Sequence, residues 1–106
     1  MAVDVDRLLA RVPTGLLIGG QWRDASDNSV YEVENPATGE TIATLASGTS
    51  EDARAAMDAA CEAQAGWAAT PARERSDILR RAFDLVQERK EEFATLMTLE
   101  MGKPLA

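Results

Sequence analysis

The chain has 106 residues, with 11 Lys and Arg against 18 Asp and Glu, no His and one cysteine, Cys61. A net charge of −7 argues against binding to nucleic acid or to an anionic membrane surface, because Lys and Arg dominate both kinds of binding. Without His and with a single Cys, the sequence offers no zinc site and no internal disulfide, which favours a reducing, cytoplasmic location.

The hydrophobic residues make up 45% of the chain, but 19 of them are Ala and only 5% of the chain is aromatic. Burial stabilises by about 25 cal/mol per Å² of apolar area, so Ala contributes little per residue. Ordering one residue costs about 1–2 kcal/mol of backbone entropy. The sequence therefore predicts a marginally stable domain that depends on further chain or on another subunit.

The first third predicts a short helix and a β-hairpin. Residues 4–12 place Leu8, Leu9 and Val12 on one helical face, and Pro13 ends the pattern. The apolar run 16–18 and the run 21–23 flank Gly19-Gly20, and two glycines supply the positive φ angles of a two-residue hairpin turn.

A second hairpin is expected over residues 30–45. Residues 30–34 are rich in β-branched and aromatic side chains, and residues 41–45 alternate between two faces. The intervening Asn35-Pro36-Ala37-Thr38-Gly39 contains turn residues, with Gly39 suited to a left-handed position.

From Thr49 onward the period becomes helical. Thr49 and Asp52 suggest a capping box, and Thr70-Pro71 suggests a new helix with Thr70 as its N-cap and Pro71 as its first residue. The helix that begins after Thr49 carries a stripe of small and apolar residues. The helix that begins at Pro71 is expected to bury Ile78, Leu79, Ala82, Phe83 and Val86.

The charged run 88–92 predicts a break before a third helix, which Gly102 and Pro104 would end. The predicted fold class is thus an α+β fragment, in which two short β-hairpins precede two or three antiparallel helices. Trp22, Tyr31 and Trp67 are interpreted as core or lid-packing aromatics.

Three motifs in order carry a family resemblance: Gly19-Gly20-Gln21-Trp22, Asn35 to Glu40, and Leu99-Glu100-Met101-Gly102-Lys103-Pro104. Each is weak alone, but together they resemble the N-terminal segment of NAD(P)-dependent aldehyde dehydrogenases, from about Leu16 onward. The sequence of residues 97–106 is most similar to that of succinate-semialdehyde dehydrogenases.

The resemblance implies that residues 1–15 form an N-terminal arm and residues 16–106 a truncated N-terminal portion of the cofactor-binding domain of an α/β fold. The complete enzyme would oxidise an aldehyde, succinate semialdehyde in this subfamily, with NAD or NADP, and would form a homo-oligomer. The resemblance places the nucleophilic Cys, the oxyanion donors, the Glu base and the cofactor turn downstream of Gly102-Lys103-Pro104. We therefore expect the 106 residues alone to be scaffold without catalytic or cofactor-binding residues, partnered by the remainder of the enzyme.

Candidate site residues within the chain have simpler interpretations. Cys61 lies on an Ala-rich helix with no His to activate it, so a buried structural role is expected. Lys103 lacks the glycine-rich loop of a phosphate site, and Gly15, Gly19 and Gly20 fit turns.

The resemblance also implies a monovalent-cation site made by the Glu100 carboxylate and backbone oxygens near Val33 and Glu34. The simpler interpretation of Glu100 is a carboxylate on the last turn of a helix. A functional alternative for the whole chain is a self-contained α+β interaction module that dimerises through its helix stripes.

Overall fold

Four helices and two small antiparallel sheets make up the computed structural model, which describes residues 3–105. In chain order the elements are α1 (Val5–Arg11), β1 (Leu16–Ile18), β2 (Gln21–Arg23), β3 (Val30–Glu34), β4 (Thr41–Ala46), α2 (Ser50–Ala69), α3 (Ala72–Glu88) and α4 (Lys90–Met101). The predicted order of two hairpins followed by helices is confirmed.

The first sheet pairs β1 with β2 in the register expected for a two-residue turn, with Ile18 opposite Gln21. Gly19 and Gly20 have φ angles of 60° and 79°. A type I′ turn requires positive φ at both central residues, which glycine adopts without steric cost, so these two residues fix the hairpin.

The second sheet pairs β3 with β4, with Val30 opposite Ala46 and a register irregularity between Val33 and Glu34. The turn between them closes on Asn35, whose backbone oxygen accepts from the N–H of Gly39 at 2.7 Å. The Asn35 side chain also accepts from the N–H of Ala37 at 3.0 Å. Gly39 has φ 75°, as the sequence predicted.

The helix ends are determined by residues that lie next to them in the sequence. Asp4 caps α1 by accepting from the N–H of Arg7 at 3.1 Å, and α2 begins with the predicted capping box of Thr49 and Asp52. Arg89 breaks the helical path between α3 and α4, and Gly102 ends α4 in the left-handed conformation, with φ 77°.

The predicted start of α3 is wrong by one position. Thr70 ends α2, and its Oγ1 donates back to the backbone oxygen of Gly66 at 2.8 Å, while Pro71 takes the N-cap position of α3. Proline forces the residue before it into an extended conformation, and the Thr70 hydroxyl then serves the preceding helix.

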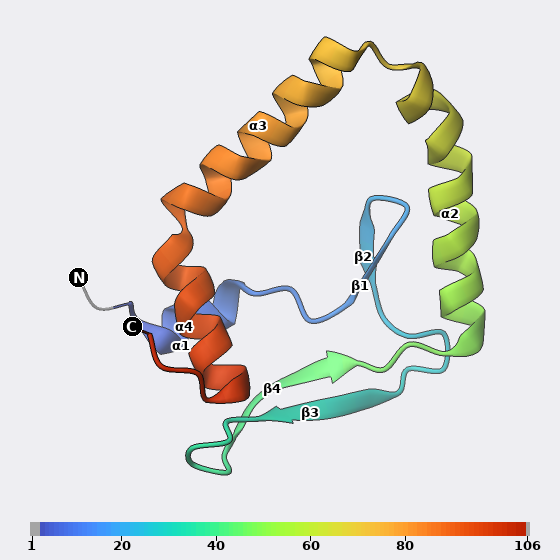
Figure 1. Cartoon of the computed structure of the whole chain (residues 1–106). Coiled ribbons are helices and arrows are strands. Elements are labelled where there is room, and N and C mark those ends of the chain that lie inside the picture. The colour runs from blue at the N-terminus through green and yellow to red at the C-terminus, as the bar shows by residue number, and fades with distance from the viewer. Residues whose placement is uncertain (1–2, 106) are drawn as a thin grey trace.

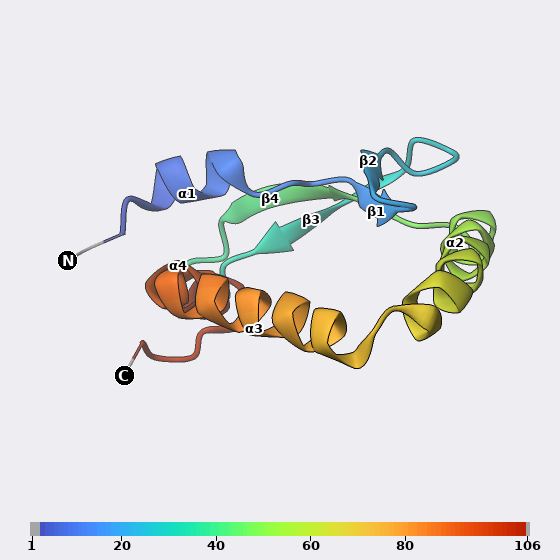
Figure 2. The same ribbon diagram turned by 90° about the horizontal axis from the view of Figure 1, so that it is seen from above.

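The helices do not pack as antiparallel neighbours, contrary to expectation. Figure 1 shows α2, α3 and α4 following one another around three sides of an open frame, with β3 and β4 along the fourth side. The β1–β2 hairpin lies inside this outline in the same view, and Figure 2 shows that the frame is thin when seen from above. Its principal extents are 47 × 37 × 20 Å.

The frame leaves most of its apolar residues exposed. Among residues 3–105 only Leu8, Ala25 and Asp52 are buried, each 4% exposed. The accessible surface is 8334 Å², whereas a compact protein of 11.4 kDa would expose about 5,800 Å². The radius of gyration, 16.9 Å, likewise exceeds the ~13 Å expected for a compact chain of this length.

Candidate interaction surface

The main feature of the chain is an apolar surface that no other element covers. On α3, the four large side chains predicted to be buried are all exposed, from 48% for Val86 to 63% for Leu79. The sequence pattern correctly identified the apolar face, but the prediction that it is buried within this chain is wrong. The three aromatics predicted to pack are also exposed: Trp22, Tyr31 and Trp67.

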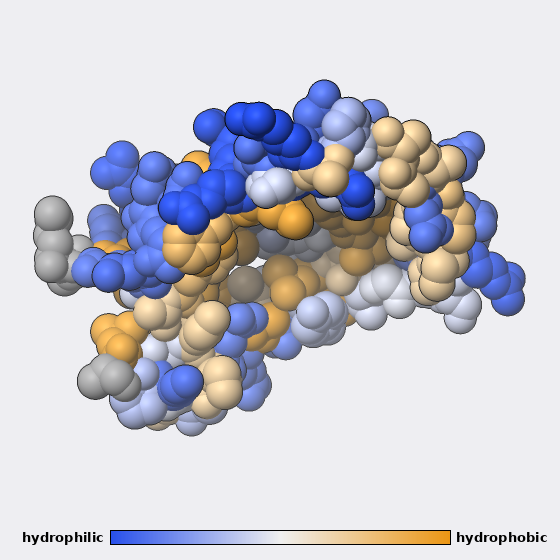
Figure 3. All heavy atoms as spheres, turned by 45° about the horizontal axis from the view of Figure 1, so that its top comes forward, coloured by the Kyte–Doolittle hydropathy of each residue, from blue (hydrophilic) through white to orange (hydrophobic). Residues whose placement is uncertain are grey.

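Charged side chains border the apolar side of α3. Arg80 Nε lies 3.6 Å from Asp84 Oδ1, and the Arg80 guanidinium lies over the ring of Phe83, 5.1 Å from its centroid. Figure 3 shows hydrophilic side chains over the outer face of α3 and hydrophobic side chains lining the hollow beneath it. We call the exposed apolar side chains of α2 and α3 the inner face: Met57, Trp67, Ile78, Leu79, Phe83, Leu85 and Val86.

The one buried charge of the described residues lies at the start of α2. Asp52 Oδ2 accepts from the backbone N–H groups of Thr49 and Ser26, at 2.9 and 3.0 Å, and also from the two hydroxyls of those residues. Arg23 NH2 lies 4.0 Å from Asp52 Oδ1. We call this group of Arg23, Ser26, Thr49 and Asp52 the Asp52 knot.

The hydrogen bonds explain the charge of the knot. The backbone N–H of Thr49, followed by that of Ser26, lowers the pKa of Asp52 below its ordinary value of 3.8, since both stabilise the carboxylate. Oδ2 accepts all four hydrogen bonds, and a carboxylate with a lowered pKa is a weaker general base. The knot ties the 24–29 loop to the first turn of α2.

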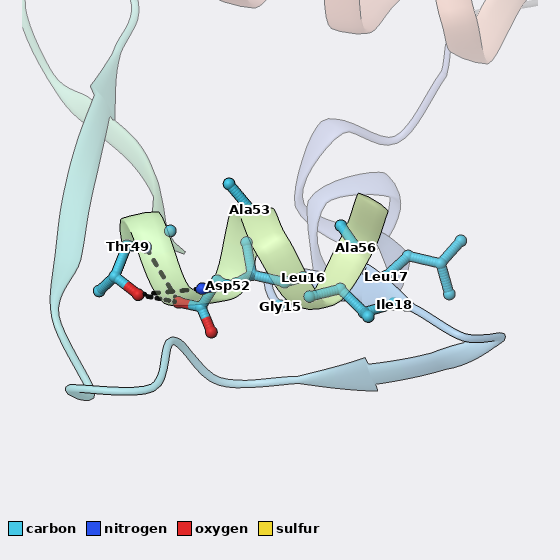
Figure 4. Close-up of a pocket in the computed structure, with 9 residues that line it drawn as sticks. Gly15, Leu16, Leu17, Ile18, Thr49, Asp52, Ala53 and Ala56 are labelled. Atoms are coloured by element: carbon cyan, nitrogen blue, oxygen red, sulfur yellow. Dashed lines mark hydrogen bonds between the residues drawn. The ribbon is translucent and has the colours of Figure 1, made fainter. Parts of the chain in front are cut away.

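A cavity of about 380 Å³ lies beside the knot, between β1 and α2. Figure 4 shows β1 side chains and small α2 residues around it, with Asp52 turned toward Thr49. The lining consists of Gly15, Leu16, Leu17, Ile18, Gly48, Thr49, Asp52, Ala53 and Ala56. Asp52 is the only ionisable residue of this lining.

The opposite corner of the frame is closed by α1 and α4. Leu8 is buried there, and Arg11 NH2 bonds Glu92 Oε1 at 2.9 Å across the two helices. A smaller cavity of about 240 Å³ lies beneath this ion pair, lined mainly by Leu8, Val12, Phe93 and Leu96. This corner and the Asp52 knot anchor the two ends of the α2–α3 arch.

Cys61 and Lys103, which the sequence analysis considered for chemistry, lie on separate segments of the chain. Cys61 is exposed on α2, which corrects the expected buried role. The segment after α4 folds back onto it, because Thr98 Oγ1 donates to the backbone oxygen of Lys103 at 2.6 Å. This arrangement fits helix termination at Gly102 rather than a phosphate-binding loop.

The residues of the proposed cation site lie on neighbouring elements, because α4 packs against β3. Glu100 and Glu34 are exposed, and Val33 is half-buried. Between residues 3 and 105, no three side chains of His, Cys, Asp or Glu are grouped as metal ligands would be. The site would therefore depend on backbone oxygens with a single carboxylate, a donor set that suits a hard cation.

The Asp52 knot is the structural feature that the sequence did not reveal in full. The capping box was visible from Thr49 and Asp52, whereas the contact with Ser26 joins residues 26 positions apart. Ser26 lies in a polar loop with no local pattern that would mark it as a partner.

Comparisons with known proteins agree on one family. The model of the aldehyde dehydrogenase family matches residues 22–106. The chain is 71% identical over 65 residues, 61% of its length, to a succinate-semialdehyde dehydrogenase of Paenarthrobacter nicotinovorans. It is 44% identical over 85% of its length to the NADP(+) succinate-semialdehyde dehydrogenase GabD of Escherichia coli K12.

Solved structures give the same result. A crystal structure of betaine aldehyde dehydrogenase from Staphylococcus aureus with NAD+ matches 95% of the chain at 33% identity, with a TM-score of 0.91. An NADP-dependent enzyme of E. coli matches 94% at 40% identity, with a TM-score of 0.87.

These relatives are much longer than the chain. It spans 14% and 19% of the two curated relatives above and 20% of each of the two solved chains. None of the helices between residues 3 and 105 is both long and apolar enough to cross a membrane.

Proposed function

We propose, since the chain belongs to the aldehyde dehydrogenase family, that it is the N-terminal structural segment of an enzyme that oxidises succinate semialdehyde to the carboxylic acid with NAD or NADP. The substrate is supported by the names of relatives from three groups of organisms: P. nicotinovorans, E. coli and the plant Arabidopsis thaliana. A glutarate-semialdehyde dehydrogenase of Pseudomonas putida is 46% identical, so the five-carbon homologue is the natural competitor.

The observation that supports the proposal is the accessible surface of the chain, which is larger than that of a compact protein of the same mass. The chain exposes about 2,500 Å² more than a compact protein of its mass, and the large apolar side chains of the inner face are among those exposed. It also spans about a fifth of the solved chains that share its fold. A segment of a larger domain has both properties, and the comparisons do not support the alternative of a self-contained interaction module.

Within that enzyme, we assign residues 16–106 to the N-terminal portion of the cofactor-binding domain and residues 1–15 to an arm that precedes it. We expect no activated nucleophile among these residues, since the sequence has no His to activate Cys61 and the Asp52 carboxylate accepts hydrogen bonds within the knot. The cysteine, oxyanion donors and base of acyl chemistry come from the remainder of the polypeptide.

The direct test is aldehyde-dependent reduction of NAD and of NADP, measured for the 106-residue chain and for the complete enzyme. We expect no turnover by the chain. We expect the complete enzyme to prefer succinate semialdehyde over glutarate semialdehyde in kcat/KM. Turnover by the chain would refute its role as scaffold, and a preference for the longer aldehyde would refute the substrate.

The Glu100 carboxylate, with backbone oxygens near Val33 and Glu34, is proposed to hold a monovalent cation in the complete enzyme. The support is the packing of α4 on β3, which brings these segments together. Replacing Na⁺ by choline should lower the melting temperature of the complete enzyme, and Glu100→Gln should abolish that dependence. Equal melting in both salts would refute the site.

We further propose that the complete enzyme is a cytoplasmic homo-oligomer. A reducing compartment suits the single free cysteine of this chain, although a relative of A. thaliana is named as mitochondrial. Cell fractionation and sedimentation of the complete enzyme test the two statements separately.

A further inference from the structure

We infer that residues 60–88, the second half of α2, the connection and α3, form a strap that becomes ordered only when the remainder of the enzyme docks against its inner face. This inference rests on the proposed function, because it takes the rest of the aldehyde dehydrogenase chain as the occupant. It adds an order of assembly: the N-terminal segment is synthesised first but completes its own helices last.

The strap makes few contacts outside itself. Within the described part of the chain, none of its residues is fully buried, and only Thr70 and Arg75 are half-buried. Its side-chain hydrogen bonds are internal: Thr70 to Gly66 at 2.8 Å and Arg75 to the oxygen of Thr70 at 3.1 Å. Its ion pair, between Arg80 and Asp84, is internal as well.

A helix in this situation is weakly held. α3 has 17 residues, little more than the ~12–15 below which an isolated helix is marginal in water. Its N-cap position is Pro71, which provides no side-chain hydrogen bond to the free N–H groups. Most helical stability in proteins comes from packing of the apolar face, and that face is uncovered here.

Both ends of the strap are anchored. The first half of α2 is held by the Asp52 knot and by contacts with β1. At the other end, α1 lies against α4 through the buried Leu8, beside the exposed Arg11–Glu92 ion pair. The anchors fix the positions between which the strap must run. They leave the strap itself without a partner.

The concave shape of the inner face indicates what kind of partner covers it. Figure 3 shows that this face lines a hollow, and a concave apolar surface is filled by a convex body. A second copy would present the same hollow and would leave much of both unfilled. The excess surface of about 2,500 Å² is roughly three times the ~800 Å² that one partner contributes to a standard protein interface.

The solved relatives support the same occupant. The frame, strap included, matches 95% of the chain with a TM-score of 0.91 to an enzyme whose chain is about five times as long. The strap therefore has, in this structure, the same arrangement as the corresponding segment of that longer enzyme.

Hydrogen exchange measured by mass spectrometry tests the inference in the 106-residue chain and in the complete enzyme. At low concentration, where sedimentation shows a monomer, we expect amides of α3 in the chain to exchange within about tenfold of the unstructured rate. Amides of β3, β4 and the first half of α2 should exchange more slowly. In the complete enzyme α3 should be protected.

A matched pair of variants locates the effect on the inner face. In the complete enzyme, Phe83→Ala should accelerate exchange of α3 roughly 100-fold, because a large apolar side chain is removed from a covered site. Asp77→Ala, on the opposite face of the same helix, should leave exchange unchanged. In the chain alone neither substitution should accelerate the exchange of α3, because Ala is a good helix former and no covering element is lost.

Slow exchange of α3 in the monomeric chain would overturn the inference. Protection that appears only as the chain dimerises would also overturn it, since a second copy would then be the occupant. A complete enzyme that shows the expected exchange pattern but no aldehyde oxidation would refute the proposed function and leave the strap supported.

Discussion

The corners of the frame and the strap differ in how far their apolar side chains are buried. Leu8, at the α1–α4 corner, is 4% exposed, whereas Leu79, on α3, is 63% exposed. Both residues were expected from helical periodicity to face a core. The difference shows that periodicity reports which side of a helix is apolar, while burial depends on whether another element lies against that side.

The largest expected effect separates these two leucines. Leu8→Ala should lower the free energy of unfolding of the chain by about 2–5 kcal/mol, because it removes a buried side chain and leaves a cavity. Leu79→Ala, the same chemical change in the strap, should have almost no effect. Urea denaturation monitored by circular dichroism measures both, and equal losses would contradict the contrast.

A second pair compares glycines at the two kinds of position. Gly102 has φ 77°, and an added Cβ would lie 3.3 Å from Pro36 Cγ, so Gly102→Ala should cost about 1–2 kcal/mol. Gly66 lies in the strap, and an added Cβ there meets nothing within 4 Å.

Gly66→Ala should therefore raise the helical content and stabilise α2 by about 0.5–1 kcal/mol, because Ala is the better helix former. The two glycine variants are compared by thermal melting. A destabilising Gly66→Ala would mean that this part of the strap already contacts another element.

The cap of α2 gives a smaller effect. Thr49→Ala removes the side chain that accepts from the Asp52 N–H at 3.2 Å and should cost about 1 kcal/mol of stability. Thr95→Ala is the control, because its hydroxyl only donates to the Glu91 oxygen within α4. Equal losses in urea denaturation would show that the knot has no special role.

The smallest effect on stability at neutral pH is expected from the protonation equilibrium of the Asp52 carboxylate. Because the folded-state pKa of Asp52 lies below 3.8, its contribution to stability is present above that pH and is lost as the pH falls through the lowered value. Asp27, whose pKa is lowered by the Ser29 hydroxyl and N–H, changes in the same direction.

Asp52→Asn should therefore reduce the loss of stability on acidification below pH 3.8. Asp27→Asn should act in the same direction and serves as the comparison outside the knot, since Asp27 bonds Ser29 within its own loop. Acid titration followed by circular dichroism measures both variants, and an acid transition that Asp52→Asn leaves unchanged would exclude the knot as its source.

Local chemistry made much of the fold predictable. Gly19-Gly20, the Asn35–Gly39 turn, the Thr49–Asp52 box and Gly102 each specify a turn or a helix end through their own backbone requirements. The family motifs predicted the family, which the match over residues 22–106 confirmed.

Features that depend on distant or external groups were not predictable. The Ser26–Asp52 contact depends on how a loop folds over a helix 26 residues later, and no periodicity encodes it. Burial of the α3 stripe was wrong because the pattern cannot tell whether its partner lies within these 106 residues. Thr70 was misassigned because its hydroxyl could serve either of two adjacent helices, and Pro71 decided the choice.

The 20 Å thickness of the frame has a consequence for catalysis. Two layers of secondary structure with their side chains need about that depth, so no point inside this segment is far from bulk solvent. A thioester or a hydride donor needs a dry enclosure to avoid wasteful side reactions. Such an enclosure requires walls on several sides, and this slab can provide only one of them.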